Sequence, residues 1–160
     1  DNGTRVPLIA SWPGVAPKGK VSQDLVDFSD FLPTLCEAAG AEVPAQLAID
    51  GRSFLPQLRG EAGNPREWIY CWYSRGGSAA KAKIFARNRR YKLMHDGSFY
   101  DMSDGYSPKS LKPAGLTGEA AAAHRMLQGV LENYKNARPA NLKGGASGGG
   151  KRKKKKANPG

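Results

Sequence analysis

Cysteine and histidine side chains are the first candidates for chemistry in this chain, because thiolates and imidazoles act as nucleophiles, bases and metal ligands. The sequence contains two of each, Cys36, Cys71, His95 and His124. Zinc sites draw pairs of ligands from closely spaced positions, and these four residues lie far apart in the sequence. Two cysteines form at most one disulfide, which excludes the dense framework of a small secreted domain. We therefore predict two buried thiols and no zinc site.

A run of six adjacent cations, KRKKKK at 151–156, is the second candidate, because such a run attracts polyanions in a salt-dependent way. The formal net charge is +11, but seven of the cations lie in residues 141–160, which contain no acid, so +4 remains for residues 1–140. No aromatic residues interleave with these cations, so a platform for base stacking is absent. Because residues 137–160 also lack apolar material, we predict a disordered tail with weak, nonspecific adhesion to polyanions and no specific nucleic-acid partner.

The elements that must position any site begin with the pattern of an α/β fold, a strand followed by helices. The apolar run VPLIASW at 6–12 ends at a Pro-Gly turn and is typical of a strand buried on both faces. Apolar residues at helical spacing predict a helix over 31–39, with Ser29 or Asp30 as its cap. A second, short helix is expected at 54–59.

A change of pattern follows, because residues 66–102 are aromatic and β-prone. We predict about four antiparallel strands there. The candidate strands are WIYCWY at 68–73, KIFAR at 83–87, YKLMH at 91–95 and SFYDM at 98–102. The last two flank Asp96-Gly97, a dipeptide favoured in tight hairpin turns.

The last predicted element is a helix near residues 118–136, after a loop rich in Ser, Pro, Gly and Lys. Its apolar residues have amphipathic spacing and should pack on the preceding sheet. They are Ala123, Met126, Leu127, Val130, Leu131 and Tyr134.

Two further features concern location. The chain begins with Asp1 and no charged-then-apolar leader, so we expect a fragment or a processed product. The longest apolar runs are far shorter than the roughly 18 residues of a membrane span, so none is predicted.

The order of five short stretches resembles the C-terminal part of sulfatases, the sulfate-ester hydrolases of the alkaline-phosphatase-like superfamily. The stretches are GTRVPLIASWPG at 3–14, LVDFSDFLPTLCEAAG at 25–40, IDGRSFLPQLRGE at 49–61, FARNRRYKLM at 85–94 and FYDM at 99–102. The resemblance runs from about Asp1 to Tyr134 and departs from the family after Asp101, where MSDGYSPKS replaces the common DPxE turn.

This resemblance implies an α/β fold class, as an α+β fragment in three parts. Residues 1–62 would end a sulfatase-type α/β catalytic domain, and residues 63–136 would form a small four-stranded antiparallel sheet with one packed helix. Residues 137–160 would be the Gly/Lys-rich tail.

The resemblance also implies the chemistry of the parent enzyme. In sulfatases a formylglycine, made from Cys or Ser in a C/S-x-P-x-R motif, attacks sulfur as its hydrate beside calcium or another divalent cation. These groups lie upstream of the stretches matched here. We therefore predict no catalytic, cofactor-binding or metal residue in this chain, which should be inactive alone and bind neither cofactor.

Two local sequences imitate this machinery. Cys71-Trp72-Tyr73-Ser74-Arg75 resembles the nucleophile motif, but Tyr73 replaces its Pro and the motif belongs upstream of the GTRVP segment. Asp1-Asn2-Gly3 resembles a metal-binding Asp-Asn pair, but in the family a loop with a catalytic Lys separates that pair from the strand. We interpret Cys71 as structural and assign no metal ligand.

Three other polar residues have two readings each. Arg5, Arg75 and His95 would either line the mouth of an anion site or serve structure, with Arg5 tethering a loop and the other two facing solvent at strand ends. The structural interpretation is preferred. His124, in an alanine-rich helix, is expected on the exposed face.

The leading hypothesis is the C-terminal portion of a sulfatase acting on a sulfated small molecule or carbohydrate. One alternative is a polyanion-binding module acting through the tail. Another is a phosphoryl-transferring relative in the same superfamily. An exported or periplasmic location is suggested by the family resemblance alone.

Overall fold

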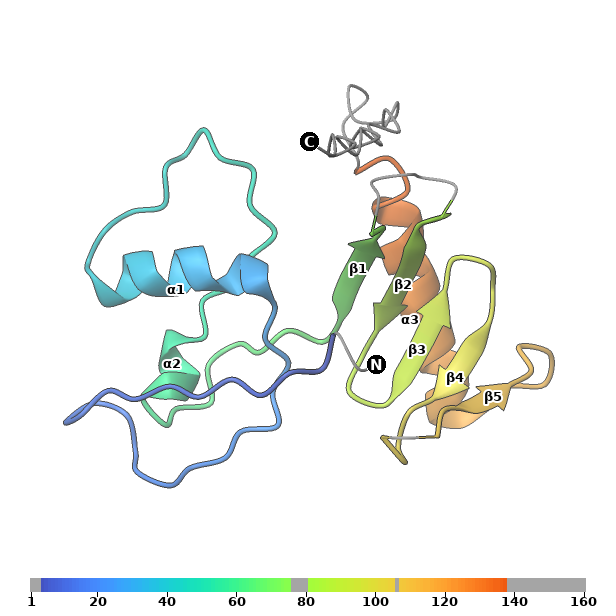
Figure 1. Cartoon of the computed structure of the whole chain (residues 1–160), viewed down its shortest axis with the longest axis horizontal. Helices are drawn as coiled ribbons and strands as arrows, with labels where there is room; N and C mark the ends of the chain where they lie inside the picture. The colour runs from blue at the N-terminus through green and yellow to red at the C-terminus, as the bar shows by residue number, and fades with distance from the viewer. Residues whose placement is uncertain (1–3, 76–80, 106, 138–160) are drawn as a thin grey trace, which may run out of the picture.

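The computed structural model describes residues 4–75, 81–105 and 107–137 (Figure 1). The predicted basic run at 151–156, nearly all of the predicted tail and the Asp1-Asn2-Gly3 segment lie outside these residues. In Figure 1, α1 (Phe31–Ala38), α2 (Leu55–Leu58) and long connecting segments lie to one side, and a sheet packed against α3 (Gly118–Asn133) lies to the other. The boundaries proposed at residues 62 and 136 stay predictions.

The sheet has five antiparallel strands in the order β1-β2-β3-β4-β5. They are β1 (Ile69–Tyr73), β2 (Lys83–Arg87), β3 (Tyr91–Met94), β4 (Phe99–Asp101) and β5 (Lys109–Leu111). The predicted turn at Asp96-Gly97 is confirmed: Gly97 has a φ of 86°, and its N–H donates to the Met94 carbonyl over 3.0 Å. A left-handed backbone of this kind favours glycine.

The prediction of four strands was one short, because β5 forms within the segment predicted to be a loop. Its sequence, KSL at 109–111, is short and polar and carries no β-pattern. β5 pairs with β4 at the edge of the sheet, where short strands with charged side chains are common. Pairing with a neighbour, rather than local propensity, explains this strand.

The predicted C-terminal helix is confirmed as α3 (Gly118–Asn133), which covers one face of the sheet. Ala123, Leu127 and Val130 are buried in its contact with the strands. On the sheet side the core is one row of residues paired across the strands, a row that alternation places on the face toward α3. This row consists of Tyr70, Ala86, Leu93, Phe99 and Leu111.

The strand predicted at residues 6–12 does not form: the segment has no regular secondary structure, and residues 6–11 are exposed. Val6, Leu8 and Ile9 expose 61%, 48% and 89% of their surface. A strand needs a neighbour to satisfy its backbone N–H and C=O groups, and no described strand lies beside this segment. The prediction of a buried strand at 6–12 is therefore wrong for the described structure, because no surface in the described residues covers this apolar segment.

The predicted helices at 31–39 and 54–59 are confirmed as α1 (Phe31–Ala38) and α2 (Leu55–Leu58). A 3-10 turn, η1 (Phe28–Asp30), precedes α1, and Asp27 caps it by accepting from the Ser29 N–H over 3.0 Å. Asp30 occupies the N-cap of α1 without capping it through its side chain. Its carboxylate is used elsewhere.

A buried ion pair uses that carboxylate and joins η1 to the approach to β1. Arg66 Nε donates to Asp30 Oδ2 over 2.8 Å, and its terminal nitrogen pairs with Oδ1. The side chains of Arg66 and Asp30 are only 6% and 3% exposed. The backbone N–H groups of Arg52 and Asp27 also donate to Asp30, over 2.8 and 2.7 Å. Burial raises the pKa of Asp30, but these hydrogen bonds outweigh it and hold the pKa below 3.8.

Candidate functional site

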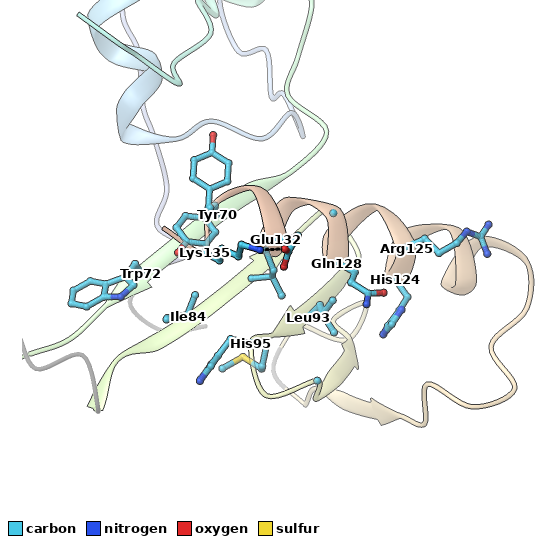
Figure 2. Close-up of a pocket in the computed structure, with 15 residues that line it drawn as sticks. Tyr70, Trp72, Ile84, Leu93, His95, His124, Arg125, Gln128, Glu132 and Lys135 are labelled. Carbon is cyan, nitrogen blue, oxygen red and sulfur yellow. Dashed lines mark hydrogen bonds and ion pairs between the residues drawn. The ribbon is translucent and has the colours of Figure 1, made fainter. Parts of the chain in front are cut away.

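An open groove of about 810 Å³ lies between α3 and the ends of β1, β2 and β3 (Figure 2). This volume falls within the range of about 300–1,000 Å³ typical of small-molecule sites. The lining combines aromatic, apolar and basic side chains. It consists of Tyr70, Trp72, Ile84, Leu93, Met94, His95, Gly97, His124, Arg125, Gln128, Gly129, Leu131, Glu132, Tyr134 and Lys135.

The floor of the groove follows from the register of the sheet. Trp72 pairs with Ile84 across β1 and β2, and the His95 N–H donates to the Ile84 carbonyl over 3.0 Å. These three residues lie two positions along their strands from the core row. Side chains alternate across a strand, so the two rows share the face toward α3. The helix packs on the core row and leaves the Trp72 row as the floor.

One stripe of α3 forms the wall. This stripe consists of Arg125, Gln128, Gly129 and Glu132. Their spacings of three and four residues place them on one side of the helix. Glu132 forms an ion pair with Lys135. Figure 2 shows His124 and Gln128 near one end of this wall, and Tyr70 with Lys135 near the other.

Stacked tyrosines close the groove at the C-terminal end of α3. The rings of Tyr70 and Tyr134 stack with centroids 4.7 Å apart and an interplanar angle of 20°. Burial raises the pKa of Tyr70, with a smaller contribution from Cys71. Burial also raises the pKa of Tyr134, and a hydrogen bond with Asp50 adds to the shift. Both phenols therefore stay neutral at neutral pH and keep their O–H donors.

Histidine 124 is more enclosed than predicted. The expectation was an exposed face of α3, but the residue is half-buried and its ring packs edge-on against Phe99, with centroids 5.1 Å apart. An alanine-rich helix gave no sign of this contact, because Phe99 lies 25 positions earlier and reaches the helix only through the sheet.

The other predicted polar residues are exposed. Arg75 follows β1 and His95 follows β3, and both face solvent as expected. The groove includes His95 but not Arg5 or Arg75. Arg5 lies near the buried Arg87, whose pKa is lowered by burial and then by the charge of Arg5.

Cysteine 71 lies in a setting that disfavours a nucleophile. It is half-buried in β1, on the face away from α3, and burial raises the pKa of its thiol, while Lys92 opposes that shift. Tyr73, which stands where the nucleophile motif has Pro, is 55% exposed. The CWYSR segment therefore does not fit the site of a formylglycine.

The described residues also do not fit a divalent cation. No three His, Cys, Asp or Glu side chains in residues 4–75, 81–105 and 107–137 gather into a group that could hold one. Calcium needs six to eight oxygen ligands, which such a group would have to provide in large part.

Comparison with known proteins identifies the family of this fold. A family model described as "N-sulphoglucosamine sulphohydrolase, C-terminal" matches residues 1–135. The ulvan-active sulfatase of Formosa agariphila is 34% identical over 100 residues, which cover 60% of this chain and 20% of that protein. The Delta 4,5-hexuronate-2-O-sulfatase of Bacteroides thetaiotaomicron is 34% identical over 144 residues, covering 84% and 29%.

Among solved structures, one described as a 2-O GAG sulfatase is similar, with a TM-score of 0.50 and 30% identity. The similarity covers 67% of this chain and 25% of that one. The chain thus has the fold of a sulfatase C-terminal region, and it belongs to the family of sulfatase C-terminal domains. It spans between 20% and 29% of the length of the relatives named here. Within its described residues, no helix has the length and apolar character needed to cross a lipid bilayer.

Sequence reasoning missed the groove and the Asp30–Arg66 pair. The groove depends on which row of the sheet α3 covers, and the ion pair joins residues 36 positions apart. Neither relation leaves a local pattern in the sequence. A predicted strand register that pairs Trp72 with Ile84 would have been the one usable sign of the groove floor.

Proposed function

We propose that this chain is the C-terminal part of a sulfatase that hydrolyses sulfate esters, with a sulfated carbohydrate as its substrate. The observation that carries the proposal is the family match over residues 1–135. The carbohydrate is supported by two relatives, one named as ulvan-active and one as acting on a hexuronate 2-O-sulfate. We also propose an exported or periplasmic location, which rests on the family resemblance alone.

The distribution of exposed apolar side chains supports a larger parent. Eleven large apolar residues in the described chain are exposed, and ten of them lie between Val6 and Ile49. Phe28 and Leu35, for example, expose 82% and 63% of their surface. Apolar surface gathered in one region marks a contact with another part of a protein. We infer that residues 6–49 pack against the α/β catalytic domain of the parent, which supplies the strands that the 6–12 segment lacks.

The divalent cation and the formylglycine belong to the parent in this proposal. The described residues fit neither group, so we place both groups upstream of this chain. Its role is structural and positional: α3 and the sheet form a stable unit, and the Asp30–Arg66 pair fixes that unit to residues 27–52.

The test is an activity assay on the full-length parent and on the 160-residue chain. With calcium present, the parent should release phenol from an aryl sulfate, and the isolated chain should not exceed a heat-treated sample. An aryl phosphate assayed in parallel separates the two superfamily hypotheses. Preference of the parent for the phosphate would overturn the sulfatase assignment, and turnover by the isolated chain would overturn the upstream location of the chemistry.

A further inference from the structure

We propose that the groove between α3 and the sheet binds a sulfated oligosaccharide, with its sugar rings along the Trp72 floor and a sulfate group at Arg125. This inference rests on the sulfatase function proposed above and assigns a ligand to a surface that the chain itself forms. The residues of α3 that line the groove run from His124 to Glu132, which is about 12 Å at 1.5 Å per residue, and the lining continues past the helix end to Lys135. That length suits a short oligosaccharide better than a single sugar.

The floor offers the surface that a sugar ring needs. The half-buried Trp72 and Ile84 lie side by side, with His95 as the next residue across the sheet. The C–H face of a pyranose is apolar, and an aromatic ring is a large, rigid surface on which it can lie. Gly97, beyond His95, adds no side chain that would obstruct the groove.

The helix wall offers donors for an anion. Arg125 is exposed and makes no ion pair or hydrogen bond within the part of the chain that the structure describes. Gln128, one turn further along α3, adds an amide donor. A guanidinium presents a planar fork of N–H groups that matches the oxygens of a sulfate. Two cations and one carboxylate line the groove, and Lys135 already pairs with Glu132. The available positive charge is therefore that of Arg125.

Glycine 129 keeps the helix wall of the groove open. It lies inside α3, where glycine destabilises a helix relative to alanine. A Cβ added at this position meets no atom within 4 Å, so packing within the described protein does not require glycine. The position lines the groove, and a side chain there would occupy its space. The absence of a side chain at Gly129 lets a ligand approach the backbone of α3 closely.

The experiment is a site-resolved NMR titration of the 160-residue chain with a chondroitin sulfate tetrasaccharide and with its desulfated counterpart. We expect saturable shifts at the Trp72 indole N–H and at the Gly97 and Gly129 amides, with roughly tenfold weaker binding of the desulfated sugar. Because resonances are assigned by residue, adhesion to the basic run at 151–156 is separated from binding in the groove.

Two variants and a matched control sharpen the test. Arg125→Gln should weaken binding roughly tenfold, and Gly129→Met should abolish the shifts while leaving the melting temperature equal or higher. Arg89→Gln removes an exposed cation that does not line the groove. This control should change neither the affinity for the sulfated sugar nor the melting temperature. Retained dispersion of the amide spectrum checks that each variant is folded.

Shifts confined to residues 138–160 would overturn the proposal. Equal affinity for both sugars, or equal effects of Arg125→Gln and Arg89→Gln, would overturn the proposal that a sulfate group binds at Arg125. These failures are distinct from failure of the sulfatase function, because the aryl sulfate assay on the parent requires no binding in the groove.

Discussion

Replacing Arg66 with methionine should destabilise the chain by about 3 kcal/mol, because it leaves the Asp30 carboxylate buried without its cation. Asp30 is 2% exposed, so water cannot take the place of the guanidinium. Removal of one partner from a buried ion pair typically costs about 3–5 kcal/mol. We expect the lower end of this range for Arg66→Met, because the Arg52 and Asp27 N–H groups still donate to the Asp30 carboxylate.

The reverse change, Asp30→Ala, should cost more, about 4–5 kcal/mol. It leaves the Arg66 guanidinium buried and also removes the acceptor from two backbone N–H groups. The double variant Asp30→Ala with Arg66→Met should cost less than the sum of the single changes, because neither charge is then left alone.

Urea denaturation at pH 7, followed by circular dichroism, measures these differences. The control is Arg52→Ala, which removes a neighbouring exposed cation but keeps the backbone N–H that Asp30 accepts; it should change stability by less than about 0.5 kcal/mol. If Arg66→Met and Arg52→Ala have the same small effect, or if the single changes are additive, the ion pair does not stabilise the fold as argued.

Three further changes have defined outcomes. Acid should destabilise the chain: the pKa of Asp30 is lowered on folding, so its contribution is present above pH 3.8 and is lost as pH falls through its folded value. Urea midpoints at pH 6 and pH 3 measure this loss of stability. If the Asp30→Asn variant loses as much stability between these pH values as the unchanged chain, Asp30 is not the cause. Leu127→Ala, at a fully buried position of α3, should cost about 2–5 kcal/mol by thermal or urea unfolding, and a cost below 1 kcal/mol would refute the packing of α3 on the core row. Truncation after Asn141 should lower the salt concentration at which the chain elutes from a heparin column, without lowering the melting temperature; unchanged elution would exclude the tail as a source of polyanion adhesion.

Sequence reasoning was most reliable where local rules decide the structure. The apolar stripe of α3 and the Asp96-Gly97 turn follow from spacing and residue type alone, and both are confirmed. The order of short motifs indicated the sulfatase family, which the family match confirms.

The errors arose where a distant partner decides the structure. VPLIASW at 6–12 has the composition of a buried strand, but its neighbours are absent from the described residues. KSL at 109–111 lacks that composition and is a strand because β4 lies beside it. Asp30 was proposed as a helix cap, whereas its carboxylate pairs with Arg66, 36 positions away. The groove was missed for the same reason, since it depends on how α3 lies across the sheet.

The most direct test of the central claim compares hydrogen exchange in the 160-residue chain and in the full-length parent. The claim is that the exposed apolar segment from Val6 to Ile49 completes a larger α/β domain. Amides of residues 6–12 should exchange rapidly in the isolated chain and become strongly protected in the parent, while those of β2 and β3 are protected in both. Equally rapid exchange of residues 6–12 in the parent would contradict the claim.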